Sequence, residues 1–274
     1  EPNKSEINVS SALIDIKYSG TVSPIALPAL LSKFINNYFP VSDSTLQPVN
    51  NNPSNFNFEI QLHNHPILSK VLFPELLEFE PGIVKGSFDS QKSELKLSAT
   101  VKKMVYGSTV IKDFAVDVNS ENKALNYKIS STSISNSQIS FDNFSLDGTI
   151  ADNRILANIS STDDKKKKLL IKSQITKNNE TYKLALDPKE LYLANNQWNI
   201  ASDNSIEFGK SGLRFHNFFI EHDESKFIIE SVHDRFNDDL NIAMQNFNIR
   251  DISQIIEKDT ALVKGTINGN VLLK

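Results

Sequence analysis

The chain has 274 residues, of which 39% are hydrophobic, 23% charged and 9% aromatic, a composition typical of a folded globular chain and not of a disordered or collagen-like one. Its formal net charge of −4 makes nucleic acid an unexpected partner, because phosphate backbones select for a basic excess. The chain has no cysteine, which excludes disulfides, thiolate metal sites and cysteine nucleophiles. No run approaches the roughly 18 apolar residues of a membrane helix. Since the start, Glu1-Pro2-Asn3-Lys4, is neither an initiator methionine nor a signal peptide, we expect a fragment of a longer protein without a transmembrane segment.

Three segments have the apolar spacing of short helices. The first covers residues 28–38 and begins at Pro28, a favoured residue for the first helical turn. The second covers residues 66–79, although Pro74 must end or kink it. The third covers residues 251–258. We therefore expect two or three short helices in the chain.

Strict alternation of apolar and polar residues dominates residues 93–249. Leu95, Leu97 and Val101, for example, alternate with charged or hydroxyl residues, the period-2 pattern of strands with one face away from water. Polar turn clusters recur about every 8–14 residues, which is typical of consecutive antiparallel strands. The pattern predicts roughly 14 strands of about 5–7 residues in one sheet.

Part of the sequence repeats itself. Residues 56–62 lead through a helix to Val84-Lys85-Gly86, and residues 240–244 lead through another helix to Val263-Lys264-Gly265. A repeat of this period favours an elongated assembly over a closed globule, although chance similarity is the alternative. We expect a strand-helix repeat unit over residues 1–80, a main curled sheet over 81–249, and the start of a further repeat over 250–274.

A sheet with one apolar face must cover that face. Too few amphipathic helices lie among the strands to do so, and we therefore predict a mainly β fold: a long, curled, antiparallel-rich sheet that forms an open β-groove. The alternative is that the same residues form the closed, dry core of a β-sandwich or solenoid.

Two stretches resemble a known family. Residues 182–220 carry Tyr182-x-Leu184-x-Leu186-Asp187-Pro188 and Trp198-x-Ile200, and residues 240–273 place a helix before Gly265-Thr266-Ile267-Asn268-Gly269. These patterns resemble the TamB (translocation and assembly module) family of the AsmA-like repeating β-groove superfamily, in the form found in the Bacteroides lineage. The likeness covers residues 80–274 well and 1–80 loosely. It consists of strand spacing and contains no catalytic signature.

The resemblance implies a function that involves no chemical reaction. It implies a periplasmic segment of an inner-membrane-anchored protein in a Gram-negative envelope, which conducts phospholipid acyl chains towards the outer membrane and supports outer-membrane protein assembly with a BamA-like factor. The alternative is a structural scaffold that docks such partners by sheet-edge pairing and binds no lipid. On either view we expect no enzyme, no catalytic residues, no metal and no cofactor.

We predict that the lipid-groove lining consists of the inward apolar residues of the alternating strands. They are Leu95, Leu97, Val101, Phe114, Val116, Leu125, Tyr127, Ile129, Leu146, Ile150, Ile155, Ile159, Ile171, Tyr182, Leu184, Leu186, Trp198, Ile200, Ile206, Phe208, Leu213, Phe215, Phe218, Ile220, Phe227, Ile229, Leu240, Ile242 and Met244.

Two other clusters have simpler interpretations. His63 and His65 share a strand face and could bind one metal ion, but no third ligand stands at a supporting spacing, so a polar strand end is the preferred interpretation. The run Lys165–Lys168 could meet anionic headgroups, but after Asp163-Asp164 we expect a solvated hairpin tip.

Overall fold

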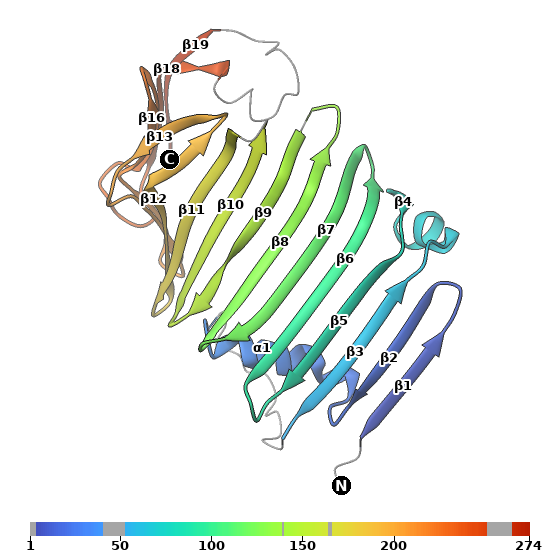
Figure 1. Ribbon diagram of the computed structural model, residues 1–274. Coiled ribbons are helices and arrows are strands. Elements are labelled where there is room, and N and C mark those ends of the chain that lie inside the picture. The colour runs from blue at the N-terminus through green and yellow to red at the C-terminus, as the bar shows by residue number, and fades with distance from the viewer. Residues whose placement is uncertain (1–3, 41–52, 139, 164–165, 251–264) are drawn as a thin grey trace. The chain divides into compact units, whose positions relative to one another are not determined.

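The computed structural model of the chain describes residues 4–40, 53–138, 140–163, 166–250 and 265–274. Over these residues 19 strands form one long antiparallel sheet that does not close, with 67% strand and 9% helix. The mainly β, antiparallel and unclosed fold predicted from the alternation is therefore confirmed. Figure 1 shows the first strands side by side, close to chain order.

The strands are β1 (Ser5–Ser10), β2 (Ile14–Gly20), β3 (Asn55–Leu62), β4 (Leu76–Phe79), β5 (Gly82–Asp89), β6 (Glu94–Tyr106), β7 (Thr109–Glu121), β8 (Ala124–Ser135), β9 (Ser140–Ala151), β10 (Arg154–Asp163), β11 (Lys166–Asn178), β12 (Thr181–Leu193), β13 (Asn196–Ile200), β14 (Ser205–Gly209), β15 (Gly212–His216), β16 (Phe218–His222), β17 (Ser225–Ser231), β18 (Leu240–Asn248) and β19 (Thr266–Leu273). The helical elements are the 3-10 turn η1 (Pro24–Ala26), the α-helix α1 (Leu27–Asn36) and the π-helical turn η2 (Leu68–Leu72).

The chain divides into two compact units. Unit 1 contains residues 1–136 and 147–153, and unit 2 contains residues 137–146 and 154–274. The domain ranges expected from the sequence stay a prediction, because they follow a sequence repeat, whereas the two units are defined by which residues pack together.

The strand lengths expected from the sequence are wrong. The strands β6, β7, β11 and β12 have 13 residues each, about twice the predicted length. Polar residues such as Asp113 do not end the strands: Asp113 lies inside β7 with a φ of +48°, a left-handed conformation that Asp and Asn tolerate better than other side chains.

The helix expected over residues 66–79 is the other error, because only the five-residue turn η2 forms there and β4 follows it. Pro74 lacks an N–H and drives the preceding residue out of the helical region, and Phe73 accordingly has φ −137° and ψ 80°. The helix expected over 28–38 is confirmed as α1 within two residues at each end. The third, over residues 251–258, lies outside the described residues.

Asn and Asp supply most of the left-handed residues at the hairpin tips. Asn122, Asn153, Asn179 and Asn195 all have φ between +53° and +66°. A two-residue turn that matches the strand twist needs positive φ, and Asn is among the residues that adopt it most readily. This use of Asn explains how a chain with only 9 glycines makes so many tight hairpins.

The core of unit 1 lies where α1 packs on one face of the sheet. Leu30 and Phe34 of α1 join a buried cluster with Tyr18, Phe56, Phe88, Leu95 and Leu125. The rings of Phe34 and Phe88 meet edge to face with centroids 5.2 Å apart, a favoured aromatic geometry. The helix thus buries the apolar face near one end of the strands.

The core of unit 2 depends on a fork in the sheet. The last residues of β12, Leu191–Leu193, pair with β13, while its first residues, Thr181–Leu184, pair with β14. The β13 branch continues through β16, β17, β18 and β19. Leu191, Trp198, Ile200 and Phe247 are buried together in this unit.

Candidate functional site

The strand register of unit 1 places every predicted lining residue of β6, β7 and β8 on one face of the sheet. The apolar face is defined here as the face that carries these side chains, and its cross-strand rows are Leu97–Val118–Tyr127, Ala99–Val116–Ile129 and Val101–Phe114. The neighbouring strands extend the first two rows through Gly86–Phe58–Tyr18 and Val84–Ile60–Ile16. Because alternate residues point to opposite faces, these rows make a continuous apolar surface.

The accessibility of this face changes along the strands. Beneath α1, Leu95 is 1% and Leu125 3% exposed, so these two predicted lining residues are core side chains. Farther along the same strands Val116 and Ile129 are only partly buried, as is Leu97, which still packs against the α1 cluster. Ile150 also packs against the α1 cluster. The face is therefore closed at the end covered by α1 and partly open to solvent beyond it.

Neighbouring side chains fill the space beside Gly86, a small residue on the apolar face. A Cβ atom on Gly86 would lie 2.3 Å from the ring of Phe58 and 2.8 Å from Leu97 Cδ2, closer than van der Waals contact allows. Gly86 thus lets the cross-strand ring of Phe58 lie flat against the sheet. The gap left by this glycine is occupied and gives no room for a guest molecule.

Unit 2 also gathers its predicted lining residues by register. One set continues across strands as Ile159–Ile171–Leu191–Trp198, and another as Phe218–Ile229–Ile242. Trp198 is 1% and Ile200 6% exposed. Around them pack Ile171, Leu186, Phe218, Ile220, Phe227 and Met244. Trp198, Ile200 and the predicted lining residues packed around them are therefore core side chains.

The other branch of the fork is more accessible. Tyr182 of β12 lies opposite Phe208 of β14, with stacked rings 5.4 Å apart, and Phe208 lies opposite Leu213 of β15. Phe208 and Leu213 are each 37% exposed. Leu184, Ile206 and Phe215 form the adjoining row. Leu146, Ile155 and Leu240 are partly buried elsewhere in unit 2.

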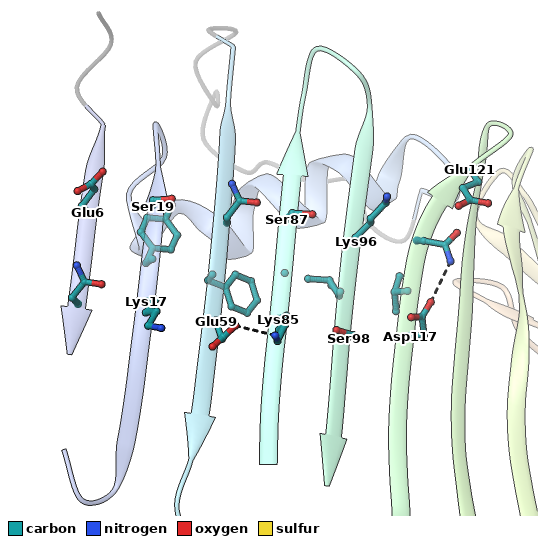
Figure 2. Close-up of a pocket in the computed structure, with 18 residues that line it drawn as sticks. Glu6, Lys17, Ser19, Glu59, Lys85, Ser87, Lys96, Ser98, Asp117 and Glu121 are labelled. Carbon is teal, nitrogen blue, oxygen red and sulfur yellow. Dashed lines mark hydrogen bonds and ion pairs between the residues drawn. The ribbon is translucent and has the colours of Figure 1, made fainter. Parts of the chain in front are cut away.

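A hollow in unit 1 lies on the opposite, polar face. Its volume is about 780 Å³, and Figure 2 shows its polar side chains along neighbouring strands, with α1 behind the sheet. Its central cross-strand row is Asn8–Lys17–Glu59–Lys85–Ser98–Asp117.

The charges in this row complement each other. Lys85 Nζ lies 3.0 Å from Glu59 Oε2, and this hydrogen bond holds the pKa of Glu59 below its usual value. Opposite charges on facing strands stabilise a register and like charges oppose it. We therefore interpret the hollow as a solvated face whose charges help to set the strand register.

Asn204, which the alternation does not mark, satisfies buried backbone groups in unit 2. Asn204 is 2% exposed. Its side chain accepts a hydrogen bond from Leu186 N–H at 2.8 Å and donates to the carbonyls of Leu186 at 2.9 Å and Ala201 at 2.7 Å. It fills the place where β12 leaves its regular pairing between Leu186 and Leu191. The alternation contains no signal for such a residue.

Lys168 departs from the solvated position expected for the lysine run, whereas Lys167 is exposed as expected. Lys168 is 5% exposed, and its Nζ donates to the carbonyl of Ser140 at 2.7 Å and lies 5.6 Å from the centre of the Phe141 ring. The register shifts here, so that Lys167 faces Thr162 and Leu169 faces Ser161, which leaves Lys168 as an extra residue that a β-bulge turns inward. Lys165 lies outside the described residues.

The histidine pair does not form a shared metal site. His63 Nε2 lies 2.8 Å from Asp15 Oδ2, while His65 Nδ1 accepts a hydrogen bond from Ile67 N–H at 3.2 Å. Among the residues that the structure describes, no group of three His, Cys, Asp or Glu could hold a metal ion. No helix in this part of the chain is long and apolar enough to cross a membrane.

Comparisons with known proteins add no relative. No protein-family model matches the chain, and neither a curated protein nor a solved structure is significantly similar to it.

Proposed function

We propose that this chain is a phospholipid-conducting segment of a TamB-like protein in the periplasm of a Gram-negative envelope. The observation that carries the proposal is the apolar face of unit 1, where rows of half-buried side chains run across neighbouring strands and where, among the described residues, α1 is the one helix that packs on them. An apolar surface that stays partly accessible in a folded chain commonly marks a binding surface. An acyl chain is the ligand whose length and chemistry suit it.

The energetic argument concerns transfer through water. Exposing an acyl chain of about 16 methylenes to water requires roughly 13 kcal/mol of free energy, at about 0.8 kcal/mol per methylene. Rows such as Val116–Ile129 and Leu97–Val118 offer apolar contact along the path and lower that cost. An unclosed sheet leaves the headgroup in water. The function requires neither a reaction nor a cofactor.

The envelope setting and the partners are part of the proposal. The TamB resemblance supports an inner-membrane-anchored parent protein and cooperation with a BamA-like assembly factor. The cysteine-free composition is compatible with an oxidising compartment.

A pair of adjacent substitutions on β7 tests the proposal. Val116→Asp places a charge on the apolar face, whereas Ala115→Asp places the same charge on the polar face, where Ala115 faces Thr100 and Ser130. We expect phospholipid co-purified from cells and measured by mass spectrometry to fall at least about fivefold in the first variant and to stay at the wild-type level in the second. Circular dichroism checks that both variants are folded.

The same pair separates the scaffold alternative. If Val116→Asp, while folded, supports outer-membrane assembly in cells as well as the wild type, the segment works as a docking scaffold and the lipid proposal is wrong.

A further inference from the structure

One segment of unit 1 exposes large apolar side chains that no core uses. The apolar tip is defined here as residues 67–77, which comprise η2, the turn after it and the start of β4. Its exposed members are Ile67 at 43%, Val71 at 68%, Leu72 at 53%, Phe73 at 54% and Leu77 at 65%. Single exposed apolar residues are normal on a protein surface, but a contiguous group marks an interaction site.

The tip is held in place by its own backbone. Leu68 is buried at 6% exposure, and Phe73 N–H donates to the carbonyl of Leu68 at 2.7 Å. Gly107 N–H donates to the carbonyl of Glu75 at 2.7 Å, and β4 pairs with the end of β6. The exposed side chains therefore sit on an anchored turn, and folding them inward would break these bonds.

The tip lies away from the core of unit 1. It follows the end of β3 at Leu62 and precedes the start of β5 at Gly82, whereas α1 packs near Phe56 and Phe88 at the other ends of the same strands. Figure 1 shows the η2 coil in cyan beside β4, outside the row of strands. Tyr106, which faces Leu76 across the pairing with β6, adds a further side chain at 49% exposure.

The size of the patch argues against a protein interface. Six large side chains that are about half exposed present on the order of 500 Å² of surface, given about 150–250 Å² for each aromatic side chain. A stable protein interface needs about 800 Å² from each partner. A lipid surface needs no complementary pocket, and a short apolar projection can enter it at any point.

The tip itself carries one cation, Lys70, and one exposed carboxylate, Glu75, so its two charges balance. Lys70 lies within the apolar residues and makes no ion pair within the described part of the chain. The nearby carboxylate of Glu78 is neutralised by Lys103, with Nζ 2.9 Å from Oε2. A lysine beside inserted apolar side chains can extend its amine to the headgroups and attract anionic lipid.

We propose that the apolar tip inserts into the headgroup region of a phospholipid bilayer and seats this end of unit 1 on a membrane surface. Val71, Leu72 and Phe73 enter the layer, and Lys70 contacts the headgroups. The tip and the rows around Val116 occupy different places, so this proposal stands independently of the lipid-conducting face.

The test is flotation of the full chain with vesicles. The tip variant carries Val71→Ser, Leu72→Ser and Phe73→Ser. A matched control carries Ile25→Ser, Leu156→Ser and Val232→Ser, which removes three other apolar side chains with exposures of 92%, 39% and 45%. Two kinds of vesicle are used: phosphatidylethanolamine with phosphatidylglycerol at a ratio of about 3:1, which is anionic, and pure phosphatidylcholine, which carries no net charge. A separate variant, Lys70→Glu, tests the contribution of charge by its binding to the two kinds of vesicle.

We expect the wild type and the control to float with the mixed vesicles, and the tip variant to bind at least about tenfold less. Lys70→Glu should weaken binding to the anionic vesicles more than to phosphatidylcholine. Equal flotation of the tip variant and the wild type, or no flotation of the wild type, would overturn the proposal. So would a concentration-dependent dimer in size-exclusion chromatography that the tip variant abolishes, because a second copy would then occupy the patch.

Co-purified phospholipid, measured on the same variants, separates this proposal from the lipid-conducting function. A tip variant that loses vesicle binding and keeps its phospholipid supports the tip alone. If the wild type floats with vesicles but contains no co-purified phospholipid, the membrane-insertion proposal is supported and the lipid-conducting function is contradicted.

Discussion

Individual polar residues hold this sheet together at the places where its regular pairing fails. Asn204 replaces the missing ladder bonds of Leu186, and the buried hydroxyl of Ser120 accepts a hydrogen bond from Leu95 N–H at 2.7 Å and donates to the carbonyl of Ser93 at 2.9 Å. An unpaired buried backbone group costs about as much as a lost hydrogen bond. These side chains therefore make the irregular strands possible.

Asn204→Ala tests this role. The substitution leaves the N–H and the carbonyl of Leu186 without the partners that Asn204 gives them, and we expect a loss of about 2–4 kcal/mol in the free energy of unfolding. Urea unfolding followed by circular dichroism measures it. Asn199→Ala, at an exposed position on the neighbouring β13, is the control and should change stability by less than about 0.5 kcal/mol. An equal effect of the two substitutions would contradict the assignment.

Asp15 predicts an acid-dependent contribution to stability. The Ser10 hydroxyl donates to its carboxylate at 2.7 Å, and His63 lies 2.8 Å away; both interactions lower the pKa of Asp15 below its usual value. A lowered folded-state pKa stabilises the fold above the unfolded value and loses that effect as the pH falls through the folded value.

We therefore expect Asp15→Asn to flatten the decline of the unfolding midpoint below about pH 4. Thermal unfolding between pH 5 and pH 2 measures the slope. Glu94→Gln, which removes one exposed negative charge at the start of β6, should keep the wild-type slope. Parallel curves for the wild type and Asp15→Asn would show that the contact contributes nothing.

At the scale of the elements, the alternation predicted the sheet face on which a side chain lies better than it predicted where each strand begins and ends. Every predicted lining residue of β6, β7 and β8 lies on the face that the alternation assigns to it. The strand lengths were wrong because β6 and β7 run on through Lys102-Lys103 and Asp113, beyond the residues over which the alternation is strict. The fork at β12 also could not be predicted, since its two halves have the same pattern but different partners.

The packing of α1 predicts a stability effect of one side chain. Phe34 is 7% exposed and contacts both Tyr38 and Phe88. We expect Phe34→Ala to lower the free energy of unfolding by about 3–5 kcal/mol and to increase hydrogen exchange in β2 and β3 beneath the helix. Lys33→Ala, at an exposed site on the same helix, should leave both unchanged. A similar, small effect of both substitutions would mean that α1 does not cover the face.

The flat packing across β3, β5 and β6 predicts an effect of overfilling. Gly86→Ala places a methyl group against the ring of Phe58 and Leu97, and we expect a loss of about 1–3 kcal/mol from the resulting strain. Chemical denaturation measures it. The double variant Gly86→Ala, Phe58→Leu should recover part of the loss because it removes the clashing ring. If the double variant is less stable than the sum of its single effects, the ring is not the cause.

At the scale of the whole chain, composition and alternation together predicted a mainly β, antiparallel sheet without closure. They also indicated a repeat, but the residues that it aligns pair differently: Phe56 faces Phe88 in β3 and β5, whereas Leu240, which corresponds to Phe56, faces Leu273 and not Ile267. The sequence pattern could not separate open from closed stretches of the apolar face, because burial depends on which element packs over it.

That distinction sharpens the proposed function. Leu95 and Leu125 lie beneath α1, and Trp198 and Ile200 lie inside the unit 2 core, so they hold the fold and do not meet a lipid. The candidates for lipid contact are the half-buried residues between, such as Leu97, Val116 and Ile129 in unit 1, and the accessible Phe208 in unit 2.

The most direct measurement is site-specific photocrosslinking in cells, with a benzophenone side chain at Val116 or Leu97 on the apolar face and at Asp117 or Lys96 on the polar face of the same strands. We predict phospholipid adducts at the two apolar positions, at least about tenfold above those at the two polar positions. Equal adducts on both faces, or none at Val116 and Leu97 in a folded protein, would contradict the lipid-conducting function.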